Sequence, residues 1–207
     1  MRDLVVATTN PGKARELRRL LAGVPARLVR LDELGIVPPA ETGATFAANA
    51  TLKARHAAEA SGLPALADDS GLVVDALGGA PGVFSARYAG AGATDEENRR
   101  RLVAELTGTP PDARAARFVC ALAIAAPDGE VTVVEGTLEG VVLTEPRGEG
   151  GFGYDPLFLL PERGKTLAEL SLDEKNAISH RARAAAAAAP VLRRLLGTCD
   201  EGAADAG

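Results

Sequence analysis

The stretch from Ala65 to Gly90, ALADDSGLVVDALGGAPGVFSARYAG, is the most informative part of the chain. Its apolar start predicts a buried strand that carries Asp68 and Asp69 side by side and ends at a Ser-Gly turn. Neighbouring carboxylates suit a hard divalent cation, because such cations prefer oxygen ligands. The segment therefore predicts an enzyme that uses carboxylates and a metal. A solvated turn is the alternative, since Asp is common in turns.

Length and charge narrow the class of protein. The chain has 207 residues, which is enough for one substantial α/β domain. Its formal net charge of −5 argues against binding to a nucleic-acid polymer, but local lysines and arginines can still hold a nucleotide. Cys120 and Cys199 form no disulfide framework or zinc motif, which favours a reducing, cytoplasmic location. Apolar runs are shorter than the roughly 18 residues of a membrane helix, so no membrane contact is expected.

Hydrophobic patterning predicts strands that alternate with helices around a central hairpin at Asp128-Gly129. Further strands are expected at residues 4–8, 26–31, 117–126, 131–143 and 157–160. Helices are expected from Asn10-Pro11 and at residues 46–61, 94–106 and 171–196. The pattern predicts an α/β fold with a mixed sheet, in which residues 1–197 form one domain. Residues 198–207 are expected to be a disordered tail.

Six residues follow the first expected strand and open the first expected helix: Thr8, Thr9, Asn10, Pro11, Gly12 and Lys13. Asn can cap a helix, and Pro suits its first position. Free N–H groups and the dipole at a helix start attract an anion, and Lys13 adds a full positive charge. The segment therefore predicts phosphate binding, with a plain helix cap and a solvated lysine as the alternative.

Two later segments add further candidate residues. Phe152 and Tyr154 stand in a glycine-rich loop, where an aromatic ring can stack on a nucleobase or can simply plug the loop base. Lys175, His180 and Arg181 lie in the last helical region, where the alternative is a charged helix face. We combine these segments with residues 8–13 and with the two aspartates. Together they predict a nucleoside triphosphate site with a divalent cation.

Five motifs in this order resemble the inosine triphosphate pyrophosphatase family. They are LVVATTNPGKARELRRLL (4–21), ETGATFAANATLKARHAA (41–58), the stretch 65–90, GGFGYDPLF (150–158) and EKNAISHRARA (174–184). The resemblance implies an ITPase-like fold of the Maf/Ham1 type, with two lobes around an elongated central mixed sheet flanked by helices. It also implies a homodimer and Mg²⁺-dependent hydrolysis of dITP, ITP, XTP and dXTP to the monophosphate and pyrophosphate, which keeps them out of DNA and RNA.

The resemblance also assigns roles to the matching residues. Asp69 becomes the catalytic residue and a metal ligand, with Asp68 and Glu41 as further metal ligands. Ser70 and residues 8–13 are expected to contact the nucleotide. The remaining expected substrate-binding positions are Phe152, Gly153, Tyr154, Asp155, Lys175, His180 and Arg181.

The sequence departs from the family pattern in its acidic residues. Ala48 stands where family members often carry Glu, and Ala40 stands where they carry a second acid before Glu41. Two other functions therefore stay open. One is a pyrophosphatase for modified pyrimidine triphosphates, as in the similarly folded septum-inhibitor family. The other is a protein that binds nucleotides without hydrolysing them.

Overall fold

A seven-stranded mixed sheet forms the centre of the computed structural model, which describes residues 2–197. The strand order is β2-β1-β3-β4-β5-β6-β7, and β1 pairs in parallel with β2 and β3 while all other pairs are antiparallel. The bounds are β1 Arg2–Val6, β2 Ala26–Arg30, β3 Ala65–Val74, β4 Ala115–Ala125, β5 Val131–Val142, β6 Phe158–Leu160 and β7 Lys165–Thr166. The predicted mixed sheet is confirmed, and β7 is a strand that hydrophobic patterning did not predict.

Within residues 2–197, five α-helices pack around this sheet. Their bounds are α1 Pro11–Leu20, α2 Phe46–Ser61, α3 Asp95–Glu105, α4 Leu172–Ile178 and α5 His180–Leu195. Asn10 caps α1, and Thr94 forms the predicted capping box with Glu97. Ser179 ends α4 and caps α5, so the last predicted helix is interrupted there by one extended residue.

The predicted turn at Ser70-Gly71 is wrong, because β3 continues through both residues to Val74. β4 pairs with β3 along this whole length, and Asp69 lies opposite Ala121 in the ladder. The Ser-Gly pair suggested a turn, but the long antiparallel partner supplies backbone hydrogen bonds that keep the chain extended. Asp68 and Asp69 therefore lie in the middle of a strand, where neighbouring side chains point to opposite faces.

Strand alternation divides the buried apolar residues of this part of the sheet into two layers. Leu66 and Leu122 pack with residues of α1 and α5 on one face. Ala67 and Ala123 pack with the alanines of α2 on the other face. The apolar face of α2 consists mainly of alanine, so this helix lies close to the sheet. The same alternation places Asp68 on the face of Leu66, toward α1 and α5, and Asp69 on the face of Ala67, toward α2.

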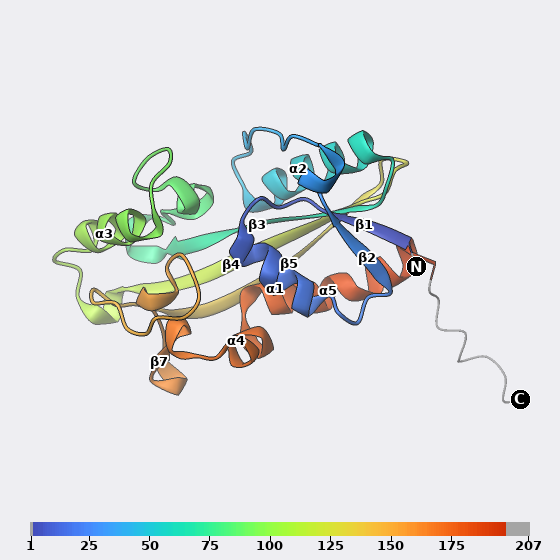
Figure 1. The fold of residues 1–207 in the computed structure, drawn as a ribbon. Coiled ribbons are helices and arrows are strands. Elements are labelled where there is room, and N and C mark those ends of the chain that lie inside the picture. Colours follow the sequence, from blue (N-terminus) through green and yellow to red (C-terminus); the bar gives the residue numbers. More distant parts are fainter. Residues whose placement is uncertain (1, 198–207) are drawn as a thin grey trace, which may run out of the picture.

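The long strands β3, β4 and β5 run from this region into a second lobe, which contains α3, β6 and β7 (Figure 1). A separate buried cluster fills that lobe and includes Phe118, Leu138, Leu102 and Leu157. The elongated, two-lobed architecture expected from the sequence is confirmed.

The N-terminal end of α5 approaches β5 closely at Gly136. A Cβ atom at this position would lie 2.2 Å from the His180 backbone oxygen and 2.5 Å from the Ala184 nitrogen. The absence of a side chain at Gly136 thus lets the start of α5, with His180 and Arg181, sit directly on the sheet.

The predicted tail at residues 198–207 and Cys199 lie outside the described residues. Cys120 is buried and free. Within residues 2–197, no helix combines the length and the apolar character needed to cross a membrane.

Candidate active site

A cavity of about 470 Å³ opens where β1, β3 and the starts of α1 and α5 meet the second lobe. The expected site residues that line it are Thr8, Thr9, Asn10, Lys13, Glu41, Asp69, Ser70, Phe152, Gly153, Tyr154, His180 and Arg181. Segments that lie far apart in the sequence thus contribute to one cavity.

The loop between β1 and α1 forms one wall of the cavity. The Asn10 side chain accepts a hydrogen bond from the Lys13 backbone nitrogen at 3.1 Å, and Thr8 Oγ1 accepts one from the Asn10 nitrogen at 3.3 Å. These bonds hold the first turn of α1 in place. Its N–H groups and the Lys13 ammonium give this wall a positive potential that suits phosphate groups.

A second part of the cavity wall carries two carboxylates that share a lysine. Lys53 Nζ lies 2.6 Å from Glu41 and 3.3 Å from Asp69. Asn49 Nδ2 donates to the other oxygen of Asp69 at 3.2 Å, and Arg87 contacts Glu41 at 3.1 Å. Asp69 thus has one protein donor on each oxygen in this network and faces the cavity with unused lone pairs.

The ionisation of these groups follows from burial and from their neighbours. Burial raises the pKa of Asp69, and Lys53 and Lys13 oppose this only in part. Burial also acts to raise the pKa of Glu41, but Lys53 and Arg87 outweigh it and the pKa is lowered. Burial acts to lower the pKa of Lys53. Asp69 and Glu41 act in the opposite direction, and the pKa is raised overall. The wall therefore combines a charged Glu41–Lys53 pair with a carboxyl of increased basicity.

Asp68 lies on the other face of β3 and does not line the cavity. Its side chain contacts Lys13 Nζ at 2.5 Å and Arg181 Nε at 2.9 Å. Ser70 Oγ and Cys120 Sγ each donate to it at 3.0 Å. The sequence argument that the two aspartates project together into one metal site is therefore wrong, since strand geometry separates them.

The cavity wall nevertheless fits a magnesium ion. Among residues 2–197, no group of three or more His, Cys, Asp or Glu side chains is arranged to hold a metal ion. Glu41 and Asp69 are two carboxylates on one wall, joined through Lys53. Mg²⁺ is commonly held by one or two carboxylates together with substrate phosphates and water. The donor set thus suits a cation that arrives with a phosphate chain.

Phe152 and Tyr154 form the aromatic part of the cavity. The Phe152 ring lies 4.8 Å from Lys175 Nζ and 5.8 Å from the Arg181 guanidinium carbon. Tyr154 donates its hydroxyl hydrogen to the Ser85 carbonyl at 2.9 Å, which ties the loop to the second lobe. The ring faces are therefore held in place by cations and by the protein backbone.

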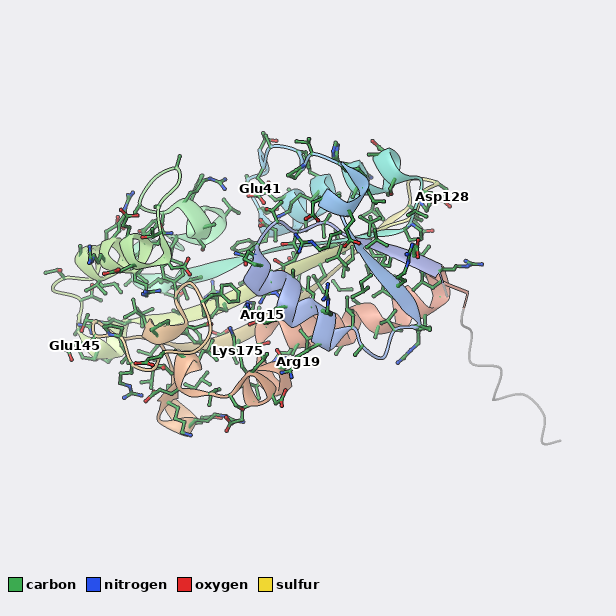
Figure 2. The ribbon with its side chains drawn as sticks, in the orientation of Figure 1. Arg15, Arg19, Glu41, Asp128, Glu145 and Lys175 are labelled. Atoms are coloured by element: carbon green, nitrogen blue, oxygen red, sulfur yellow. The ribbon has the colours of Figure 1, made fainter. Side chains whose placement is uncertain are left out.

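A buried set of alternating charges supports this wall from behind. Lys175 Nζ contacts Asp155 at 2.5 Å and Glu16 at 2.8 Å, and Glu16 also accepts from Arg181. Burial raises the pKa of Asp155, although Lys175 opposes it. In Figure 2, Lys175 and Glu41 lie on opposite sides of the central strands.

His180 stacks on Phe118, with ring centroids 4.8 Å apart and planes at 11°. Burial, together with nearby Arg181, holds the pKa of His180 well below its usual range, so its imidazole is neutral at pH 7. Its Nδ1 atom is buried and has no hydrogen-bond partner among the described residues. The ring is thus placed at the cavity as a neutral group.

Comparison with known proteins identifies the family. The model of the Ham1 family matches residues 4–191. The chain belongs to the Ham1 family.

Ham1 relatives share most of their length with this chain. The dITP/XTP pyrophosphatase of Geobacillus kaustophilus is 55% identical over 185 residues, which cover 89% of this chain and 91% of that protein. The dITP/XTP pyrophosphatase of Thermus thermophilus is 55% identical over 181 residues, which cover 87% of each chain.

Solved Ham1 structures superpose well on this one. A HAM1 protein from Coxiella burnetii gives a TM-score of 0.86 at 43% identity and covers 94% of this chain and 100% of that chain. A nucleoside-triphosphatase, or dITP/XTP pyrophosphatase, from Mycobacterium abscessus gives a TM-score of 0.74 at 45% identity, with 91% and 99% coverage.

The two departures from the Ham1 acidic pattern lie beside the cavity rather than in it. Ala40 and Ala48 line a neighbouring surface hollow, which shares only Pro39 with the cavity. The carboxylates that face the cavity, Glu41 and Asp69, are both present. The two alanines thus leave the cavity wall itself intact.

Some expected residues act from behind the wall, and some residues of the site were not predicted. Pro11, Gly12, Asp68, Asp155 and Lys175 do not line the cavity.

Sequence reasoning missed Asn49 and Lys53, which lie four residues apart on α2 and both contact Asp69. Two polar residues at this spacing in an alanine-rich helix were a usable signal, because they share one face. It also missed Glu16, whose partners come from distant segments and leave no local pattern.

Proposed function

We propose that this chain hydrolyses deaminated purine nucleoside triphosphates, such as dITP, ITP, XTP and dXTP, to the monophosphate and pyrophosphate. The observation that carries the proposal is one cavity that is lined both by the start of α1 with Lys13 and by Asp69, Glu41 and Lys53. Membership of the Ham1 family and the names of the relatives support the same reaction. The enzyme thereby clears these nucleotides from the pool used for DNA and RNA synthesis.

The phosphate chain binds at the start of α1. Its oxygens accept hydrogen bonds from the side chains of Thr8 and Thr9, which line the cavity, and lie at the positive end of the α1 dipole. Lys13 offsets part of their negative charge. This places the phosphoanhydride in the cavity that Asp69 and Glu41 also line.

Asp69 acts on the attacking water. It accepts a proton from the water as the oxygen attacks phosphorus, the bond to the α–β bridging oxygen breaks, and pyrophosphate leaves. Asn49 and Lys53 orient its two oxygens through their hydrogen bonds. Phosphoryl transfer depends mainly on positioning and electrostatics, so these groups suffice without a covalent nucleophile.

Glu41 and Asp69 are the residues that would hold Mg²⁺, together with the phosphate oxygens. When bound, the cation neutralises charge on the phosphate oxygens and makes phosphorus more electrophilic. Lys53 keeps both carboxylates in position through its contacts at 2.6 and 3.3 Å.

Base selection uses the 6-position of the purine. Hypoxanthine and xanthine present an acceptor there, whereas adenine presents a donor. Arg181 lines the cavity and keeps N–H donors beyond those bonded to Asp68, Glu16 and Ser70. An adenine leaves such buried donors without a partner, and this costs binding energy.

Pyrophosphate release from ITP, dITP, XTP, GTP, ATP and modified pyrimidine triphosphates with Mg²⁺ tests the proposal. We expect kcat/KM to be at least about 100-fold higher for ITP and XTP than for ATP. Equal rates on ATP and ITP would contradict the selectivity. Faster turnover of modified pyrimidine triphosphates would move the protein to another substrate class, and binding without turnover would contradict hydrolysis.

The family resemblance further supports a homodimer in the cytoplasm. Light scattering on the purified chain tests the first point, with a mass of about twice the 21.2 kDa protomer expected. Cell fractionation tests the second, and recovery in a membrane or exported fraction would contradict it.

A further inference from the structure

Asp68 differs from the other carboxylates of the site in the number of its protein partners. Its Oδ1 atom accepts from Lys13 at 2.5 Å and from Ser70 at 3.0 Å. Its Oδ2 atom accepts from Arg181 at 2.9 Å and from Cys120 at 3.0 Å. A carboxylate has about four lone-pair directions, so the four donors use its hydrogen-bonding capacity.

The same carboxylate is closed to the cavity. The Asp68 side chain is 0% exposed, compared with 8% for Asp69, and only Asp69 lines the cavity. A cation held on the cavity wall by Glu41 and Asp69 would lie on the other face of β3. Asp68 could reach it only by giving up its contacts with Lys13 and Arg181.

Both cations that Asp68 holds do line the cavity. Lys13 reaches it from α1 and Arg181 from α5, and Asp68 lies between them on the sheet. Arg181 is further fixed by Glu16 and Ser70. One carboxylate thus joins Lys13 at the start of α1 to Arg181 at the start of α5 through two charge-assisted contacts.

We propose that Asp68 is a positioning residue, the shared counter-ion that holds Lys13 and Arg181 at the cavity, and that it is not a metal ligand. Its position with respect to the substrate rests on the proposed function. The two cations offset the cost of burying its charge, so removing the charge takes an ion-pair partner from Lys13 and one of two carboxylate partners from Arg181. The expected consequence is poorer nucleotide binding at an unchanged metal requirement.

Magnesium titrations of the D68N and E41Q variants test the metal part of the proposal. E41Q is the matched control, because it makes the same carboxylate-to-amide change on the cavity wall. Pyrophosphate release is measured with dITP held at several times each variant's KM. We expect D68N to raise KM at least about tenfold and to leave the half-maximal Mg²⁺ concentration within about twofold of wild type. E41Q should raise that concentration at least about tenfold.

The opposite result would overturn the proposal. If D68N raises the Mg²⁺ requirement as much as E41Q does, Asp68 acts as a metal ligand. If D68N changes neither KM nor the Mg²⁺ requirement, it does not position the cations.

Urea unfolding without metal or nucleotide tests the counter-ion part. The proteins are wild type, D68N, K13M and the double variant K13M/D68N, all in EDTA. In the K13M background, we expect the effect of D68N on the unfolding equilibrium constant to shrink at least about fivefold. Additive effects would contradict the proposal. If D68N alone does not fold, a folded double variant supports the proposal and an unfolded one contradicts it.

The unfolding cycle also separates this proposal from the proposed function. It contains no substrate, so its result stands even if the wild-type protein releases no pyrophosphate. That failure would contradict the proposed function alone.

Discussion

Asp69 and Asp68 are consecutive residues of β3, but they face different surroundings. Asp69 faces α2 and the cavity, with Asn49 and Lys53 as its partners. Asp68 faces α1 and α5 and has four donors around it. Burial acts to raise the pKa of both, yet Arg181 and Lys13 hold the pKa of Asp68 well below its usual range, while that of Asp69 is raised.

The difference shows how a strand can supply two functions from neighbouring positions. The face with unused lone pairs and a raised pKa suits proton transfer. The face with a fully paired carboxylate suits the positioning of cations. Two identical side chains thus have different partners, because strand alternation places them in different layers.

The largest expected effect is on turnover in D69N. The amide cannot accept the proton from water, so we expect kcat for dITP to fall by about 10²- to 10⁴-fold. Circular dichroism should show an unchanged fold. Turnover near the wild-type rate would remove Asp69 from the chemistry and would break the contrast with Asp68.

Stability should change in opposite directions in the two aspartate variants. D68N removes the carboxylate that lies between Lys13 and Arg181 and leaves Arg181 with Glu16 as its carboxylate partner, and we expect a loss of about 3–5 kcal/mol in the free energy of unfolding. The raised pKa of Asp69 means that its ionised form costs stability at pH 7. D69N should therefore change stability by less than about 1 kcal/mol, toward higher stability. Urea denaturation measures both, and equal losses would contradict the comparison.

The third prediction concerns the loss of folding stability that His180 causes in acid. Burial and Arg181 lower the pKa of His180, while Asp68 acts to raise it and Lys175 and Lys13 act to lower it. The unfolded chain then binds a proton below about pH 6.5 that the folded chain refuses. Stability should fall by up to about 1.4 kcal/mol for each pH unit below this value.

The H180Q variant isolates this effect, because glutamine does not titrate. The unfolding free energy of wild type and H180Q is compared between pH 5 and 7.5 (~2.5 units around the ordinary histidine pKa). Wild type should lose more stability than H180Q on acidification. Parallel pH profiles would show that His180 does not carry this dependence.

The smallest effect is expected at Cys120, a neutral partner of Asp68. Burial and Asp68 raise the pKa of this thiol, so it stays protonated and donates to the carboxylate. C120A removes the donor and should cost about 1 kcal/mol of stability. C120S keeps a donor and should cost less. Equal losses in thermal denaturation would show that the contact contributes little.

Local sequence patterns were sufficient for most of the elements. The capping box at Thr94 and the Asp128-Gly129 hairpin act over a few residues, and both lie where they were predicted. The turn at Ser70-Gly71 was not realised, because β4 pairs with β3 through these residues. The break at Ser179 was also missed, since a serine can cap a helix or lie within one.

The sequence by itself determined the α/β class, the main strands and helices, and the motifs whose residues line the cavity. The class and the elements follow from hydrophobic periodicity and capping, which depend on near neighbours along the chain, whereas the motifs were assigned to one site by their resemblance to the inosine triphosphate pyrophosphatase family. Only the tertiary structure decided which aspartate faces the cavity, and which cations Asp68 and Glu16 hold. Those pairings join β3, α1, α4 and α5 across long sequence separations, and they depend on strand continuity and on the approach of α5 at Gly136. Electrostatic pairing of this kind is set by distance in space, so it leaves no periodic trace in the chain.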